Sequence, residues 1–171
     1  AVSYAEENNG CVLRMYDDVT EKSTISAGSF SIDMNGHTIN GLNVAKSANL
    51  DISNGTVTGP VIVAKAAEFN ASDLIFKGIV NSNGNNSKLL DCTFEQALNA
   101  RGSHTVINYC TLNGALNVSG DDVVVNGGSI SGKITVNNGG VLELVGNGGQ
   151  YGEALVKSGG TMKVHTGSTF N

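Results

Sequence analysis

Aromatic residues, proline and clusters of basic residues are scarce in this chain. Its 171 residues include no tryptophan, one proline and 5% aromatic residues, so few rings are available for stacking on sugars. The formal net charge is −5, and no group of lysines and arginines stands together to neutralise phosphates. No run of about 18 apolar residues occurs. We therefore expect no nucleic-acid partner and no membrane insertion of these residues.

Glycine and asparagine, by contrast, are abundant. The chain has 23 glycines, and asparagine often precedes glycine, as at positions 35–36 and 54–55. Both residues favour tight turns. A helical globule has little use for so many of them, whereas a coiled chain with three corners per turn needs them. The length is that of one domain with a continuous core.

An 18-residue period runs through the middle of the chain. Phe94, Leu112 and Ile130 are separated by this interval. Other columns with the same interval are Leu98, Leu116 and Ile134; Ala100, Val118 and Val136; Asn81, Asn99 and Asn117; and Cys92 with Cys110. In a coil whose turns stack roughly 4.8 Å apart, each residue lies above its counterpart one turn earlier. The period therefore predicts an all-β fold, a single-stranded parallel β-helix with about 18 residues per turn.

The positions around these columns fit such a coil. Thr93 and Thr111 each precede an inward residue, so the alternation of a strand points them outward. Gly114 and Gly132 mark a corner at which a Cβ would obstruct the bend. The column of Asn81, Asn99 and Asn117 is expected to stack with amide-to-amide hydrogen bonds.

The three cysteines do not by themselves define a compartment. Cys92 and Cys110 lie in one inward column on neighbouring turns, where stacked side chains point the same way. We interpret them as two buried thiols, and a bridge between them is the alternative. Cys11 has no evident partner.

A second period bears on the handedness of the coil. Eight apolar residues follow one another at six-residue intervals: Ala100, Val106, Leu112, Val118, Val124, Ile130, Val136 and Leu142. Hexapeptide repeats are typical of left-handed β-helices. In that fold the residue two positions earlier is small, yet here Leu98, Leu116 and Ile134 hold this position. A right-handed coil is favoured, and the left-handed coil is the alternative.

Two segments make up the predicted domain organisation. Residues 1–10 are expected to form a short capping helix, because Val2, Tyr4 and Ala5 lie on one helical face and Gly10 follows as a stop signal. Such a cap covers the strand edges and core at the first turn. Residues 11–171 are assigned to the parallel β-helix as one domain, expected to be a fragment of a longer protein.

The first turns show the same period. Leu50 lies 18 residues after Ile32, and the same interval places Asp51 above Asp33. Two carboxylates one turn apart repel each other unless they are solvated. This column is therefore expected to face water.

Residues 1–40 resemble the opening of β-helical domains in large surface proteins of Gram-positive bacteria. Those domains begin with an alanine-rich cap helix, then a strand of the form v-L-x-x-D-v-T, then the segment I-D-L-N-G-H-T-I. The corresponding residues here are Leu13, Asp18, Val19 and Thr20, followed by Ile32-Asp33-Met34-Asn35-Gly36-His37-Thr38-Ile39. The resemblance implies a right-handed β-helix of the pectin-lyase-like type, exported and either displayed on the bacterial cell surface or secreted.

The last part of the chain has a different texture. Gly-Gly pairs at 139–140, 148–149 and 159–160 stand beside short apolar strands. This portion is similar to the stalk repeats of self-associating autotransporter passengers, V-x-x-G-G-x-x-x-V. The similarity implies that the β-helix continues here, and it makes self-association a further expectation.

Pectin-lyase-like β-helices include polysaccharide lyases and glycosidases, so an enzyme has to be considered. Glycoside hydrolysis generally needs a pair of carboxylates. Asp73 and Asp91, one turn apart, are the candidate catalytic pair. Both precede an inward strand, at a corner where aspartate is also ordinary turn chemistry.

Candidate binding residues cluster after residue 100. Arg101 and His104 share one corner and suit an anion or a sugar acid, although a solvated turn is the simpler interpretation. Tyr109, like Tyr151, is expected to be exposed and available to a sugar ring. The three histidines lack metal-ligand spacing, and no metal or cofactor is predicted.

These observations favour a non-catalytic extracellular module that acts in adhesion or as a rigid display stalk. Its expected partners are host or bacterial glycans or surface proteins. The alternative is a carbohydrate-active enzyme, a polysaccharide lyase or glycosidase, or a sugar-binding module of the same fold.

Overall fold

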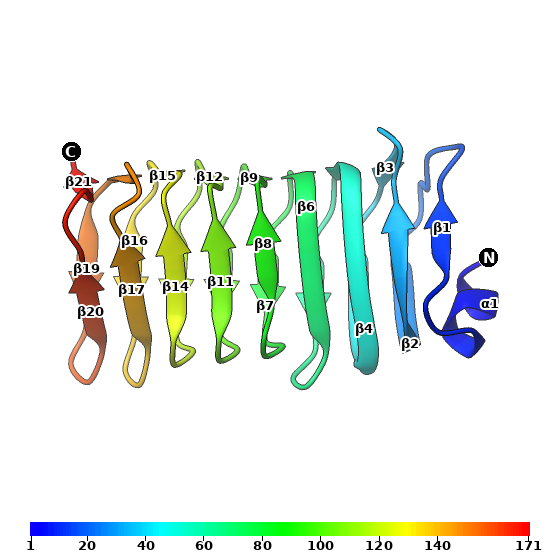
Figure 1. The fold of residues 1–171 in the computed structure, drawn as a ribbon, viewed down its shortest axis with the longest axis horizontal. Helices are drawn as coiled ribbons and strands as arrows, with labels where there is room; N and C mark the ends of the chain where they lie inside the picture. Colours follow the sequence, from blue (N-terminus) through cyan, green and yellow to red (C-terminus); the bar gives the residue numbers. More distant parts are fainter.

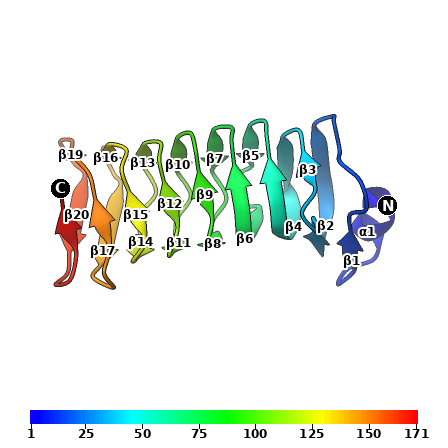
Figure 2. The ribbon, with the colours of Figure 1, turned by 90° about the horizontal axis from the view of Figure 1, so that it is seen from above.

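Short strands with alternating inward and outward side chains make up most of the chain. In the computed structural model, which describes residues 1–171, they stack in parallel into a solenoid of about 8 turns with about 19 residues per turn (Figure 1). Strands on the near side run upward, and the chain crosses the top edge and returns behind (Figures 1 and 2). Because the turns advance from right to left in this view, the coil is right-handed.

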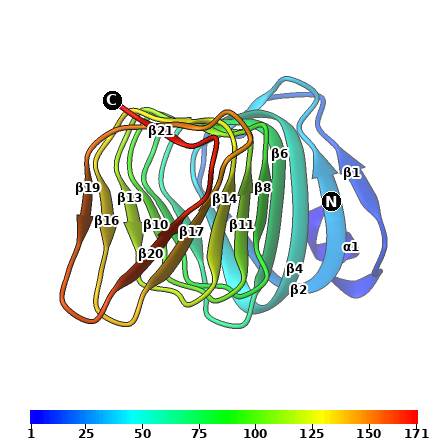
Figure 3. The ribbon, with the colours of Figure 1, turned by 60° about the vertical axis from the view of Figure 1, so that its left-hand side comes forward.

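Each complete turn contributes strands to three faces, which Figure 3 separates. The front face, nearest the viewer in Figure 1, contains β1 Val12–Arg14, β2 Ser23–Asp33, β4 Leu42–Val57, β6 Glu68–Phe76, β8 Lys88–Leu90, β11 Thr105–Asn108, β14 Val123–Asn126, β17 Val141–Val145 and β20 Thr161–Val164. The top face contains β3 Thr38–Ile39, β9 Thr93–Phe94, β12 Thr111–Leu112, β15 Ser129–Ile130, β18 Gln150–Tyr151 and β21 Thr169–Phe170. The back face contains β5 Val61–Val63, β7 Val80–Ser82, β10 Leu98–Ala100, β13 Leu116–Val118, β16 Ile134–Val136 and β19 Ala154–Val156. The long strands bend across corners, so β2 and β4 begin on the back face, and β4 and β6 end on the top face.

The 18-residue register holds through the middle of the rod. Phe76 pairs with Phe94, and Leu112 pairs with Ile130. All four side chains are buried, and the rings of Phe76 and Phe94 stack with centroids 4.9 Å apart. Together with the other inward columns they belong to one continuous core of 38 buried residues. The predicted inward columns are therefore confirmed.

The asparagine column forms the expected ladder. Asn99 Nδ2 donates to Asn81 Oδ1 at 2.9 Å, and Asn117 Nδ2 donates to Asn99 Oδ1 at 2.8 Å. A second ladder, which the sequence analysis missed, joins Asn126 Nδ2 to Asn108 Oδ1 at 2.6 Å on the front face. Each ladder adds side-chain hydrogen bonds that run in the same direction as the backbone bonds between turns.

The six-residue ladder of the left-handed alternative does not exist in the structure. Val106 and Val124 are partly exposed, whereas their neighbours Ile107 and Val125 are buried. The ladder combines inward and outward positions because β11 and β14 carry valine or isoleucine on both sides of the strand. Apolar identity alone does not report the direction of a side chain on such a strand.

A short helix covers the first turn, as predicted. Helix α1, Val2–Glu7, lies across β2, with Ala5 fully buried beneath it (Figure 1). The Glu6 carboxylate accepts a hydrogen bond from the backbone N–H of Ser26. Gly28 has a φ of 83°, and a Cβ there would meet the backbone of Glu6 at 2.8 Å. This glycine allows the helix to lie directly on the strand.

The predicted register of the first turns is wrong. Strands β2 and β4 pair with an interval of 19 residues up to Ile25 and of 20 from Ala27 onward, because β4 carries an extra residue at a bulge. Ile32 therefore pairs with Ile52 rather than with Leu50. The interval also grows to between 19 and 21 residues after β14.

The wrong register also moved two carboxylates. Asp33 pairs with Ser53, and Asp51 pairs with Ser31, so the two aspartates do not stack. Asp33 instead accepts hydrogen bonds from the Asn35 N–H at 3.0 Å and from Asn54 Nδ2 at 3.2 Å.

Tyr151 is buried, not exposed as predicted. It pairs with Ile130 in the inward column of the top face, because three extra residues separate β15 from β18 relative to the 18-residue interval. Its ring packs at 5.7 Å from that of Phe170, and its hydroxyl has no hydrogen-bond partner. Burial raises the pKa of this phenol.

Cys92 and Cys110 are stacked and unbridged. Cys110 Sγ accepts a contact from the Cys92 backbone N–H at 3.4 Å, and both residues are buried. The hydrogen bond with Cys92, together with burial, raises the pKa of the Cys110 thiol. Cys11 is also free. The interpretation of Cys92 and Cys110 as buried thiols is confirmed.

Candidate functional site

A hollow of about 300 Å³ lies on the front face where β2, β4, β6 and β8 run side by side. The outward positions of four consecutive turns supply its polar groups, which are Ser31, Asp51, Ser53, Asn70, Ser72 and Lys88. Leu90 forms one apolar edge. The alternation within each strand sends the intervening residues Ile52 and Ala71 into the core, so the floor is backbone.

One column crosses the middle of this hollow. Ser31 pairs with Asp51, Asp51 pairs with Asn70, and Asn70 pairs with Lys88. Asn70 Nδ2 donates to Asp51 Oδ1 at 2.8 Å, which orients the amide. The buried carbonyl oxygen of Asn70 has no hydrogen-bond partner. The column therefore presents acceptors at Asp51 and Asn70 beside the ammonium group of Lys88.

Asp73 and Asp91 lie outside this hollow. Both are exposed on neighbouring turns of the corner between the front and top faces, with φ of 54° and 51°. Asn35, Asn54 and Tyr109 occupy the same corner with φ between 50° and 61°. We call this column of five residues the front–top corner. Asparagine and aspartate tolerate the left-handed conformation better than most residues, so the backbone accounts for both aspartates.

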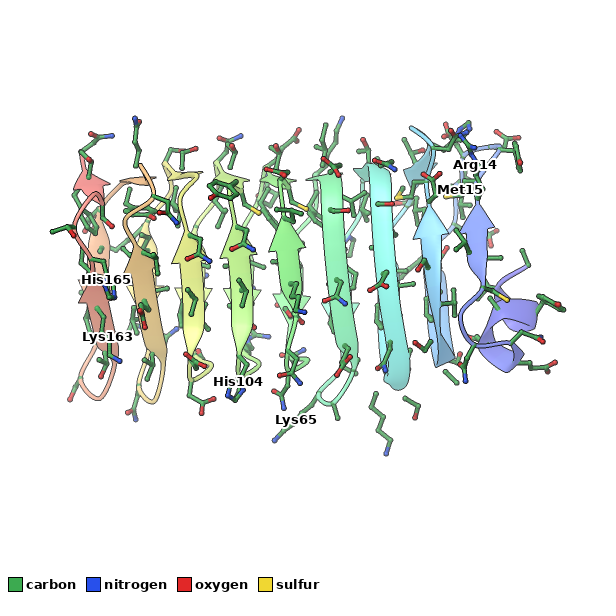
Figure 4. The ribbon with its side chains drawn as sticks, viewed as in Figure 1. Arg14, Met15, Lys65, His104, Lys163 and His165 are labelled. Carbon is green, nitrogen blue, oxygen red and sulfur yellow. The ribbon has the colours of Figure 1, made fainter.

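Arg101 and His104 share the corner between the back and front faces. Arg101 Nη1 contacts Asn83 Oδ1 at 3.5 Å, and His104 Nε2 lies 3.7 Å from an oxygen of Asp122. Figure 4 shows His104 at the lower edge of the rod. Asp121 on the same corner accepts a hydrogen bond from the Ser103 hydroxyl, which lowers its pKa.

Tyr109 is 55% exposed, as predicted, but it lies apart from Arg101 and His104. It follows the end of β11, whereas those two residues precede the start of β11. The four residues of this strand separate the two corners by roughly 13 Å. None of the three lines a hollow of the structure, so they do not form one pocket.

Two further hollows lie near the ends of the rod. A cavity of about 260 Å³ between α1 and the first turn is mainly apolar, with Leu13, Ile25 and Ile39 among its lining residues. A second hollow of about 350 Å³ lies beside β15 and β18 and is lined mostly by polar groups, among them Ser131 and Glu153. The front-face hollow is the one that combines a carboxylate, an amide and an ammonium group.

Each histidine stands beside one carboxylate. His37 Nδ1 lies 3.3 Å from Asp18, and His165 Nε2 lies 2.8 Å from Glu143 near the last turn (Figure 4). No group of three or more His, Cys, Asp or Glu side chains is arranged to hold a metal ion. No helix is long and apolar enough to cross a membrane.

No family model, no curated protein and no solved structure matches this chain. The functional argument therefore depends on the geometry of the rod itself.

Proposed function

We propose that this chain is a non-catalytic, extracellular module of a bacterial surface protein, acting in adhesion or as a rigid display stalk. The resemblance of residues 1–40 to Gram-positive surface domains supports the setting, and it places the fold in the pectin-lyase-like type. The observation that carries the proposal is the uninterrupted stacking of about 8 turns, each hydrogen-bonded to the next on all three faces.

Stacking of this kind gives stiffness. The turns are joined by parallel strand pairs from β1 to β20 on the front face alone, and the asparagine ladders and the Phe76–Phe94 stack connect several of them further. Bending the rod requires these bonds to open on one side. The lateral faces are therefore held in fixed positions, which suits a surface that displays or binds other molecules.

The expected partners of these faces are host or bacterial glycans or surface proteins, and self-association is a further property to test. The polar hollow on the front face favours glycans among these partners. A carbohydrate-active enzyme of the same fold is the second candidate, because the Asp73 and Asp91 carboxylates lie on adjacent turns roughly 4.8 Å apart, near the spacing of retaining glycosidases.

A glycan array with the intact chain, combined with assays for reducing ends and unsaturated products, separates these candidates. We expect binding without turnover. Turnover that disappears in Asp73→Asn or Asp91→Asn, but persists in the control Asp17→Asn, would replace the adhesive module by an enzyme with its site on the front–top corner. Binding that is lost when the protein is unfolded by urea, and regained on refolding, would tie the activity to the rod.

A further inference from the structure

We propose that the front-face hollow is a binding site for one uncharged sugar ring or a similar polyol. The inference rests on the proposed adhesive role and assigns a ligand class to a specific place on the rod. The site consists of the Ser31–Asp51–Asn70–Lys88 column with the flanking residues Ser53, Ser72 and Leu90.

The hydrogen-bonding groups of the hollow have free capacity. Asp51 uses Oδ1 to accept from Asn70, and its second oxygen has no protein partner. The carbonyl oxygen of Asn70 is buried without a partner, and a buried acceptor in this state costs free energy until a donor satisfies it. Lys88 makes no ion pair. Adjacent hydroxyl groups, each able to donate and accept, match two acceptors next to one ammonium donor.

The charges in the hollow favour an uncharged ligand. The carboxylate of Asp51 and the ammonium of Lys88 are both within the lining, so their charges offset each other. A sugar acid would gain from Lys88 but would bring its carboxylate toward Asp51, and an amine would meet Lys88 in the same way. A neutral polyol uses both groups without either repulsion.

The size and the apolar edge fit one ring. A volume of about 300 Å³ is at the lower limit of small-molecule sites, which run from roughly 300 to 1,000 Å³. Leu90 is 41% exposed at the edge of the hollow, where it can pack against the C–H groups of a sugar ring. Because no aromatic ring lines the site, we expect weak binding, with a dissociation constant on the order of 1 mM.

The test is a two-dimensional amide NMR titration of the intact chain with glucose, galactose and mannose separately, and with glucuronate as the charged comparison. We expect at least one neutral sugar to shift the amides of β4, β6 and β8 around the hollow in a saturable way. Asp51→Asn should weaken this binding ~10-fold, the effect of removing a charged hydrogen-bond acceptor. Lys88→Gln should weaken it ~5-fold.

The variants are chosen to keep the rod folded. Asp51→Asn leaves an oxygen for Asn70 to bond, and it recreates an asparagine pair of the kind that already exists between Asn81 and Asn99. Glu95→Gln and Lys77→Gln are the matched controls, since both are exposed, lie outside the hollow and change the net charge by the same amount. Both controls should bind like the unaltered chain.

Three outcomes would overturn the assignment. In the first, no sugar shifts the hollow at concentrations up to about 50 mM, well above the range of weak ligands. In the second, Asp51→Asn binds as well as the unaltered chain. In the third, glucuronate alone binds, and added salt abolishes its binding, as expected for simple attraction to Lys88. Sugar-induced shifts confined to another face would also reject this site while leaving the adhesive module intact, whereas turnover in the array assay would reject the module itself.

Discussion

Close contact between turns makes some glycines irreplaceable. Gly132 has an ordinary backbone conformation, but the position of a Cβ on it is already occupied by the carbonyl group of Gly114, one turn earlier. Gly36 is the opposite case, with a φ of 84° and nothing within 4 Å of a Cβ. The two glycines therefore separate the cost of crowding from the cost of backbone conformation.

We expect Gly132→Ala to lower the free energy of unfolding by about 3 kcal/mol, because backbone cannot move aside as a flexible side chain does. Gly36→Ala should cost only about 1 kcal/mol, the price of a left-handed alanine. Urea denaturation of both variants measures the difference. Equal losses would mean that the turns separate easily at this corner.

Asn99 is the central member of the back-face ladder and makes hydrogen bonds to both neighbours. Asn99→Ala removes both and should lower the free energy of unfolding by about 2 kcal/mol. Thr135→Ala is the control, since Thr135 lies in the same column but makes no side-chain hydrogen bond, and it should change stability by less than about 0.5 kcal/mol. Thermal unfolding followed by circular dichroism compares the two. A similar loss in both variants would assign the stabilisation to the strand rather than to the amides.

Helix α1 seals the first turn through one small buried side chain. Ala5→Arg places a long charged group where Ala5 is fully buried, so the helix should lift from β2 at a cost of about 2 kcal/mol. Hydrogen exchange should accelerate in β1 and β2 and stay unchanged in β12. Tyr4→Arg on the same helix is the control, because Tyr4 is 64% exposed. Faster exchange throughout the rod after Ala5→Arg would show that the cap stabilises all turns together.

The strands that the sequence predicted well are those between β6 and β16. There the interval is constant at 18, so identity of spacing is enough to place Phe94 above Phe76 and Leu116 above Leu98. Toward either end the interval varies between 18 and 21, and the extra residues fall at a bulge in β4 or in turns. A fixed period has no means of locating such insertions, which is why the place of Tyr151 was missed.

The front-face hollow was missed for the same reason. The intervals along its column are 20 from Ser31 to Asp51, 19 to Asn70 and 18 to Lys88. No single period aligns these residues, so only their serine, amide and charged character was visible. Asp73, Asp91 and Tyr109 were visible as exposed corner residues, but the sequence does not distinguish a corner that needs left-handed backbone from a corner that binds a ligand.

At the scale of the whole molecule, several carboxylates make stability depend on acid. The hydrogen bond from the Thr38 backbone lowers the pKa of Asp18, and the hydrogen bond from Asn54 lowers that of Asp33. A group with a lowered pKa in the folded state stabilises that state above its ordinary pKa, which is 3.8 here, and loses this contribution as the pH falls through the lowered value. The rod should therefore be most resistant above this range.

We expect the thermal midpoint to be steady from neutral pH down to about 4 and to fall at lower pH. Asp18→Asn should make this fall shallower, since asparagine can still accept from Thr38 but does not titrate in this range. Glu21→Gln, an exposed residue without a hydrogen-bond partner, is the control and should leave the slope unchanged. A slope that is the same in all three proteins would remove Asp18 from the acid response.

The front–top corner has a wider consequence for the rod. Asn35, Asn54, Asp73, Asp91 and Tyr109 share one backbone conformation although their side chains differ in charge, size and aromaticity. The fold asks this line for a backbone angle and leaves the chemistry of the side chain open. Successive turns thus offer a row of sites whose chemical content can be rewritten, one turn at a time, by mutation or by a designer, while the stacking beneath stays the same.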